Sequence, residues 1–242
     1  MIERVVKASD FHVPFHDKKT IGVALGFIRY VKPDILIIDE LMDFYSISKF
    51  NKDPHRKLHL QKDLDMAKKI LVDIRKSAPN ARIIMLESNH AKRLVKFLRS
   101  KAEELSDLRC MKLKELLELD NFNIEYKKTF TFRKVLFKHG NIVRQHSGYT
   151  AKAEMDKEGT SGASGHTHRL GMYFRTLRGG EYVWVEGGCL CSRKCGDEYV
   201  EGTANWQQGL SMFTFKKGKK RFHPELIPII DREILWGGKS FK

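Results

Sequence analysis

The chain has 242 residues, and 45 Lys and Arg against 30 Asp and Glu give it a formal net charge of +15. Hydrophobic residues make up 41% and aromatic residues 10% of the sequence, which excludes a disordered polycation. No apolar run approaches the roughly 18 residues of a membrane helix, and four Cys are too few for a disulfide scaffold. The positive charge favours an anionic partner, nucleic acid first, although a generally basic surface explains it equally well.

The beginning of the chain reads Met-Ile-Glu-Arg-Val-Val-Lys and lacks the apolar segment of a signal peptide. We therefore expect a cytoplasmic protein with no membrane association. The length allows one large domain or two small ones. Because no linker rich in Pro, Gly or Ser and no internal repeat divides the sequence, we predict a single domain over residues 1–242.

The first half of the chain alternates strand and helix patterns. Strands are predicted at 4–8, 35–38 and 81–86, and helices at 18–31, 60–76 and 91–119, the last one interrupted near 106–107. After Asn121 the pattern changes to short strands, with one helix between them. These strands are predicted within 122–137 and at 134–138, 171–177, 181–186, 209–215 and 222–230, and the helix at 151–158. The order predicts an α/β fold of two packed sheets flanked by helices.

Short polar clusters stand where predicted strands end, and one stands just before a strand. They are Asp10-Phe11-His12, Asp39-Glu40-Leu41-Met42-Asp43, Ser88-Asn89-His90, His139-Gly140 and Gly165-His166-Thr167-His168. Loops at strand ends converge in α/β sheets, and side chains at i and i+2 of an extended chain point the same way. A single such cluster is usually an ordinary loop. The complete series favours a metal site, and carboxylate with imidazole suits Mn, Fe, Zn or Ni, singly or as a pair.

In this order the clusters resemble the calcineurin-like metallophosphoesterase superfamily, whose pattern is D-x-H, GD-x-x-D, GNH-[D/E], H and GH-x-H. The resemblance runs from about Val5 to Leu170, and more loosely through 205–209. The stretches 10–17 and 146–150 are similar to bacteriophage and prophage members. The resemblance implies a four-layer α/β/β/α sandwich of two mixed sheets. It also implies two divalent metal ions, with manganese as the first choice and iron, zinc, nickel or magnesium as alternatives.

The resemblance also implies a role for each site residue. Asp10, His12 and His168 would hold one metal, Asn89, His139 and His166 would hold the other, and Glu40 takes the position of the bridging carboxylate. His90 would protonate the leaving oxygen or stabilise its developing charge. Asp43 would hydrogen-bond His90 and orient it.

The chain departs from the family pattern in two motifs. Asp39-Glu40 stands where the family has Gly-Asp, and Ser88 and Ala91 replace the Gly and the final Asp or Glu of the third motif. Glu40 is one methylene longer than Asp, whereas metal–ligand distances tolerate about ±0.2 Å. Bridging by Glu40 therefore requires an adjusted rotamer or backbone, and Asp39 could take over some ligation if the loop shifts.

Basic residues follow the third motif in a predicted helix. Lys92, Lys96 and Arg99 share one face at i, i+4 and i+7, and we predict Arg93 and Lys92 as substrate contacts. A solvated helix face is the alternative. A second basic cluster, 216–221, reads as the charged turn of a hairpin that could also contact phosphates. Cys189, Cys191 and Cys195 are predicted to be reduced thiols near a strand end, because a structural zinc site needs four ligands.

These features predict a metal-dependent hydrolase, most specifically a phosphodiesterase or nuclease that acts on nucleic acid or nucleotides. A phosphomonoesterase or a cyclic-nucleotide phosphodiesterase is the alternative within the same chemistry. A non-catalytic nucleic-acid-binding protein that kept the fold is the alternative from another class.

Overall fold

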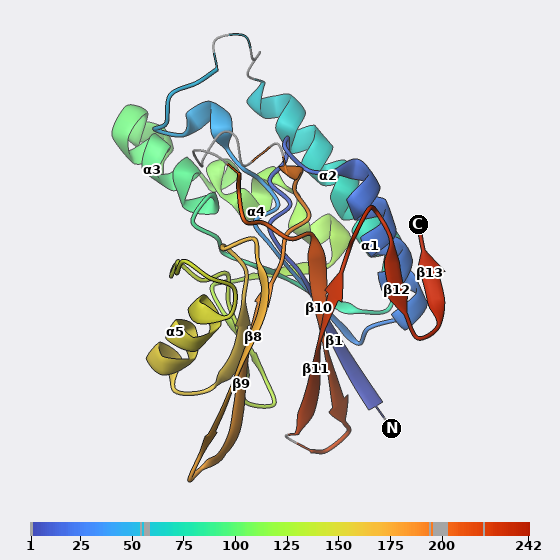
Figure 1. Ribbon diagram of the computed structural model, residues 1–242. Helices are drawn as coiled ribbons and strands as arrows, with labels where there is room; N and C mark the ends of the chain where they lie inside the picture. Colours follow the sequence, from blue (N-terminus) through green and yellow to red (C-terminus); the bar gives the residue numbers. More distant parts are fainter. Residues whose placement is uncertain (1, 54, 56–58, 194, 196–202, 220) are drawn as a thin grey trace.

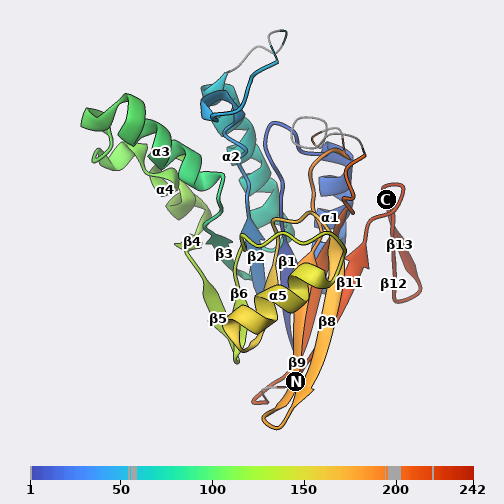
Figure 2. The ribbon, with the colours of Figure 1, turned by 60° about the vertical axis from the view of Figure 1, so that its left-hand side comes forward.

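The computed structural model describes residues 2–53, 55, 59–193, 195, 203–219 and 221–242. Two β-sheets pack face to face at its centre, and helices cover the outer face of each sheet (Figures 1 and 2). This confirms the α/β/β/α sandwich expected from the sequence. No helix in the described ranges combines the length and the apolar composition that crossing a bilayer requires.

The larger sheet has six strands in the order β11-β10-β1-β2-β3-β4. They are β1 (Ile2–Ala8), β2 (Ile35–Asp39), β3 (Arg82–Leu86), β4 (Ile124–Lys127), β10 (Gly209–Lys216) and β11 (Phe222–Pro228). Strands β1 to β4 run parallel, and β10 and β11 add an antiparallel hairpin beside β1. The loops that follow β1, β2 and β3 therefore open at the same edge of the sheet.

The smaller sheet has five strands in the order β5-β6-β7-β9-β8. They are β5 (Phe130–Phe132), β6 (Val135–Phe137), β7 (Ser161–Ser164), β8 (Leu170–Leu177) and β9 (Gly180–Gly187). Strands β6, β7 and β9 are parallel, and β5 and β8 pair antiparallel at the two edges.

The apolar side chains of the larger sheet alternate between two cores, as the period of a strand requires. In β1, Val6 packs with the helices, whereas Val5 faces the smaller sheet and packs with Phe137 and Phe213. Leu36 and Ile37 alternate in the same way in β2. Because β2 and β3 are buried on both faces, residues 35–38 and 83–86 read as continuous apolar runs.

The helices are α1 (Lys18–Val31), α2 (Leu60–Ser77), α3 (Ala91–Lys101), α4 (Leu113–Leu116) and α5 (Tyr149–Glu158). The side chain of Asp17 caps α1 by accepting hydrogen bonds from the N–H groups of Lys19 and Thr20 at 3.0 and 3.1 Å. Helices α1 to α4 contribute to the core on the larger sheet, and α5 covers the outer face of the smaller sheet by packing on Trp184.

Two segments differ from the prediction. The helix predicted over 91–119 ends at Lys101, and 3₁₀ turns at Glu103–Leu105, Arg109–Met111 and Leu119–Phe122 replace most of the remainder. An antiparallel hairpin of β12 (Ile234–Trp236) and β13 (Lys239–Phe241), absent from the prediction, packs aromatic rings on Phe27 of α1.

Candidate metal centre

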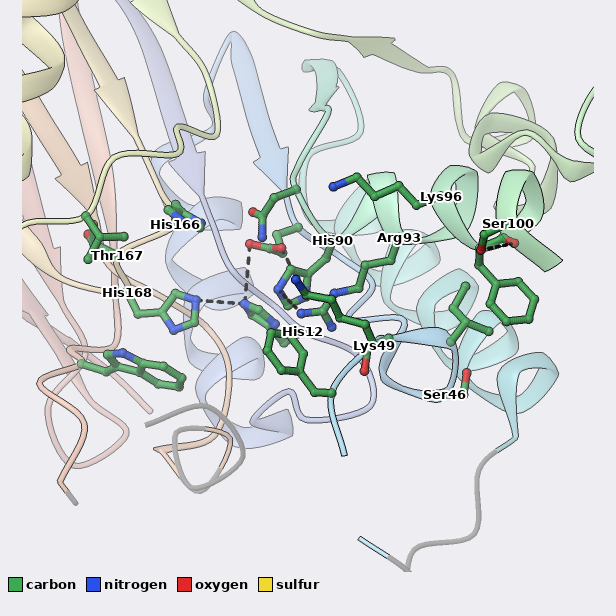
Figure 3. Close-up of a pocket in the computed structure, with 18 of the residues that line it drawn as sticks. His12, Ser46, Lys49, His90, Arg93, Lys96, Ser100, His166, Thr167 and His168 are labelled. Carbon is green, nitrogen blue, oxygen red and sulfur yellow. Dashed lines mark hydrogen bonds and ion pairs between the residues drawn. The ribbon is translucent and has the colours of Figure 1, made fainter. Parts of the chain in front are cut away.

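The predicted ligands, which lie far apart in the sequence, meet at the carboxyl ends of β1, β2, β3, β6 and β7. Three of them, His12, His166 and His168, are labelled in Figure 3. They are Asp10, His12, Glu40, Asn89, His139, His166 and His168, and their contacts join them into one cluster. Apart from Asn89 and His166, each of them is buried. The sandwich therefore concentrates carboxylates and imidazoles in one site with little access to water.

The first group of donors consists of Asp10, His12 and His168. The Nε2 atoms of His12 and His168 face each other at 2.9 Å, and Asp10 Oδ1 lies 3.8 Å from the former and 3.3 Å from the latter. Two neutral imidazoles share at most one proton between these nitrogens. A divalent cation among the three side chains would satisfy both nitrogens and the carboxylate at once.

The second group consists of Asn89, His139 and His166. His139 Nε2 lies 2.6 Å from Asn89 Oδ1, and the ring of His166 meets that of His139 edge to face at 5.2 Å. Glu40, His139 and His166 offer ligand atoms that all lie within 4.8 Å of one another. This group too can hold a cation.

Glu40 joins the two groups. Its Oε2 lies 2.8 Å from His139 Nε2 and 3.7 Å from His12 Nε2. Its other oxygen, Oε1, is buried 3.4 Å from His90 Nδ1 and has no hydrogen-bond partner among the residues that the structure describes. A buried carboxylate oxygen without a donor is costly unless a cation completes the site. The residues present therefore fit a pair of divalent metals with Glu40 between them.

The backbone at these ligands is strained. Asp10, His12, Glu40, His166 and His168 all have positive φ, between 43° and 71°. Residues with a Cβ seldom adopt this left-handed conformation, and such strain concentrates at functional sites. The left-handed turn at Glu40 is the backbone adjustment that the longer side chain requires.

Asp39 does not replace Glu40 as the bridge. Its Oδ2 forms an ion pair with Lys7 Nζ at 2.5 Å, and its Oδ1 accepts a hydrogen bond from the N–H of Asp10 and lies 3.4 Å from His139 Nδ1. Lys7 and Asp39 are both fully buried. Asp39 thus contacts the loops that carry Asp10 and His139. Lys7, which no sequence motif indicates, neutralises the charge of Asp39.

The carboxylates and imidazoles of the site shift one another's pKa. Burial raises the pKa of Glu40, but the positive charges of His139 and its neighbours outweigh burial and lower that pKa to about 2. Burial lowers the pKa of His139, but the carboxylates of Glu40 and Asp39 outweigh it and raise that pKa to about 10. Burial, together with the charge of His139, lowers the pKa of His166 to about 4. A bound cation would take the place of the proton on His139.

Asp43 organises the approach to the ligands. Its Oδ2 lies 2.8 Å from His12 Nδ1 and 3.2 Å from His90 Nδ1. Arg93 donates hydrogen bonds to Asp43 Oδ1 and to its main-chain oxygen, both at 3.0 Å, and its second terminal nitrogen lies 2.9 Å from His90 Nε2. Burial raises the pKa of Asp43, but hydrogen bonds from the two histidines outweigh it and keep that pKa far below the ordinary range. Asp43 stays ionised and orients both imidazoles.

No protein-family model matches the chain. It is 30% identical over 257 aligned positions to the Gene 54 protein of Mycobacterium phage L5, with all of both chains covered. It is 31% identical to the Gene 54 protein of Mycobacterium phage D29, with 95% of each chain covered. The chain belongs to the Gene 54 protein family of mycobacteriophages. The expected likeness to bacteriophage proteins is thereby confirmed.

Solved structures with a similar fold include two Vps29 proteins. A single mutant of Vps29 from Entamoeba histolytica has a TM-score of 0.39 at 10% identity, with 93% of this chain and 98% of that chain covered. The Vps29 of Chaetomium thermophilum has a TM-score of 0.39 at 9% identity, with 93% and 96% covered.

A cavity of about 780 Å³ lies beside the predicted metal ligands of this Gene 54 family protein. Its floor includes Glu40 and His90, and Arg93 and Lys96 line one side (Figure 3). Lys92 lies outside this lining and pairs with Glu87 at 3.2 Å. Of the predicted substrate contacts, the structure thus places Arg93 at the site and Lys92 beyond it.

Glu186 is a second supporting residue that the sequence did not indicate. Its Oε1 accepts hydrogen bonds from the N–H groups of Gly148 and Ala151 at 2.8 and 3.1 Å, and its Oε2 accepts one from the Thr167 hydroxyl at 2.7 Å. The carboxylate thereby ties the loop that carries His166 and His168 to the start of α5. No spacing in the sequence connects these distant residues.

The cysteines are free thiols, as predicted, and Cys189, Cys191 and Cys195 are buried. They pack with Phe15 and Trp206, and Cys189 and Cys191 lie within 4.8 Å of a ring nitrogen of His168. These thiols fill the space behind the metal ligands.

Proposed function

We propose that this protein is a calcineurin-like metallophosphoesterase that uses two divalent metals to hydrolyse phosphodiesters of nucleic acid or nucleotides. The observation that carries the proposal is Glu40, whose carboxylate lies between two separate groups of buried donors. A carboxylate in that position is the bridging ligand of a two-metal centre. The net charge of +15 supports a polyanionic substrate.

In this proposal Asp10, His12 and His168 would hold one metal, Asn89, His139 and His166 would hold the other, and Glu40 would contribute a ligand between them. Divalent cations, manganese first, supply Lewis-acid activation of water and of the phosphate when bound. The protein fixes the ligands at strand ends with left-handed backbone, and the buried Lys7–Asp39 pair holds the loops in place.

His90 is the proton donor for the leaving oxygen in this mechanism. Asp43 Oδ2 lies 3.2 Å from its Nδ1, and Arg93 donates a hydrogen bond to its Nε2. A bound phosphate offers Arg93 a charged acceptor in place of His90. Movement of Arg93 to the phosphate would free Nε2 of His90 to carry the proton that the leaving oxygen receives.

The test is hydrolysis of bis-p-nitrophenyl phosphate with added manganese, compared between the wild type and His90→Ala. We expect the variant to lose a factor of about 10²–10⁴ in kcat, because general-acid assistance has that magnitude, while it binds the same amount of manganese. Lys92→Ala is the matched control, since its side chain lies outside the cavity. If no divalent metal supports hydrolysis and the protein still binds DNA, the non-catalytic alternative replaces the proposal. Faster hydrolysis of p-nitrophenyl phosphate than of the diester would favour a phosphomonoesterase.

A further inference from the structure

The cavity above the metal ligands continues along one face of α3. Arg93, Lys96, Phe97, Ser100 and Lys101 line it at helical spacings of three and four residues (Figure 3). From Arg93 to Lys101 the face extends for about 12 Å, at about 1.5 Å per residue. The site is therefore the deep end of a groove.

The groove is positively charged. Lys96, Lys101 and Lys49 are exposed and line it, and within the described part of the chain none of them is paired with a carboxylate. By contrast, Lys92 in the first turn of α3 lies outside the groove lining and is paired with Glu87. Lysines without carboxylate partners, along a groove that leads to the proposed two-metal site, can bind successive phosphates of a nucleic-acid backbone.

Exposed aromatic rings accompany these cations. Phe97 is 37% exposed and Phe50 is 48% exposed, and both line the groove. The guanidinium of Arg93 lies 5.6 Å from the ring centre of Phe50. Aromatic side chains that alternate with cations along a groove are the usual means of binding unpaired bases and their backbone together.

We propose that this groove binds single-stranded nucleic acid, with bases stacked on Phe97 and Phe50 and phosphates beside Lys96 and Lys101. This inference rests on the proposed function and specifies its substrate. A duplex hides its base faces within its own stack, so these two rings would find no partner there. The cavity volume of about 780 Å³ is within the range of small-ligand pockets, so there is room above the ligands for unpaired nucleotides. At about 3.4 Å per stacked nucleotide, the face of α3 accommodates about three nucleotides.

The experiment measures fluorescence anisotropy of a labelled oligothymidylate and of a labelled hairpin duplex, with EDTA present to prevent cleavage. Stacking accounts for about a 5- to 150-fold change in affinity per base, so Phe97→Ala should weaken oligothymidylate binding within that range and duplex binding much less. Phe174→Ala is the matched control, because Phe174 is 65% exposed on β8 and does not line the groove. Phe50→Ala is the second variant, in case Phe97→Ala unfolds.

The lysines are tested through salt. For a single strand, the slope of log affinity against log salt falls by about 0.7 for each phosphate that the protein no longer neutralises, so Lys96→Ala with Lys101→Ala should reduce it by about 1.4. Lys157→Ala on α5, which lies outside the groove, should leave it unchanged.

Wild-type affinity for the oligothymidylate in both phenylalanine variants, or tighter binding of the duplex than of the single strand, would overturn the inference. Hydrolysis of bis-p-nitrophenyl phosphate separates this failure from that of the proposed function, since the small diester needs no stacking. Absence of hydrolysis with a stacking-dependent loss of binding refutes the catalytic proposal and supports the groove. If hydrolysis persists and the phenylalanine variants bind the oligothymidylate normally, the catalytic proposal is supported and the groove is refuted.

Discussion

Replacing Lys7 with Met should destabilise the protein through the charge it leaves behind. Lys7 and Asp39 are fully buried and 2.5 Å apart, and Lys7 also donates to Ser9. Removing one partner of such a pair strands a buried charge at a cost of about 3–5 kcal/mol. Asp39 would keep three polar neighbours, namely the N–H of Asp10, the ring of His139 and the Ser9 hydroxyl at 3.4 Å, and none of them replaces the charge of Lys7.

For a chain of this length, about 2–4 °C of Tm is lost per kcal/mol, so the melting temperature of Lys7→Met should fall by about 6–20 °C. The assay is thermal and urea unfolding in EDTA, so that metal binding does not compensate. The double variant Lys7→Met with Asp39→Asn should recover most of the loss, because it removes the stranded charge. A Tm within a degree or so of wild type for Lys7→Met, or a double variant less stable than the single one, would refute the buried-pair argument.

Three further predictions concern residues at and around the site. Glu40→Asp, which introduces the carboxylate of the metallophosphoesterase pattern, should weaken metal binding as measured by equilibrium dialysis, because the shorter side chain no longer reaches His139. Binding at or above the wild-type level would contradict this. Glu186→Ala should cost about 2–4 kcal/mol in urea unfolding, since it leaves the Thr167 hydroxyl and main-chain donors buried without an acceptor, whereas a neutral effect would argue for relaxation of the loop. Burial raises the pKa of Asp63 to about 6, so the folded state loses stability as pH rises from about 4 through 6. Asp63→Asn should therefore be more stable than wild type above that range and equal below it; we expect about 1 kcal/mol after discounting for solvent exposure, and a difference that does not change with pH would refute the assignment.

The sequence predicted which polar side chains come together because its signals are local. Each cluster follows a strand that is recognisable from a short apolar run, and parallel strands bring their carboxyl ends together without any further information. The residues that support the ligands could not be found in this way. Lys7 meets Asp39 across neighbouring strands, and Glu186 of β9 meets Thr167 in the loop after the neighbouring strand β7, so each contact depends on the finished fold.

The basic residues of α3 show that a helical pattern can predict a charged face without predicting which of its residues lie at the cavity. Lys96 lines the cavity, whereas Lys92 and Arg99 do not. The spacing of Lys92, Lys96 and Arg99 defines a charged face, but Leu94 and Leu98 decide which side of the helix is buried. With these two leucines in the core, the face that meets the cavity runs from 93 to 101 and excludes Lys92. The packing of an amphipathic helix decides which of its flanks faces a neighbouring loop. The sequence pattern alone does not contain this information.

At the end of that helix, the apolar pattern that favours a longer helix competes with residues that favour turns. Apolar residues continue beyond Lys101, yet the chain turns into short 3₁₀ segments around Ser106 and Asp107. Side chains of Ser and Asp offer the backbone local hydrogen bonds that compete with helix formation. Leu117 and Leu119 nevertheless reach the core, so the apolar pattern predicted burial correctly while overestimating helix length.

The longer carboxylate at position 40 changes how the departures from the family pattern are understood. Metal–ligand distances tolerate only about ±0.2 Å, so an extra methylene on an unchanged backbone would displace the carboxylate oxygens from the bridge. Here the preceding residue, Asp39, is fixed by Lys7, and Glu40 itself turns into the left-handed region with φ of 43°. The turn draws the main chain back, and the longer side chain reaches both His12 and His139. Lys7 thus anchors Asp39, and the left-handed turn at the next residue accompanies a Glu40 side chain that reaches both groups of donors.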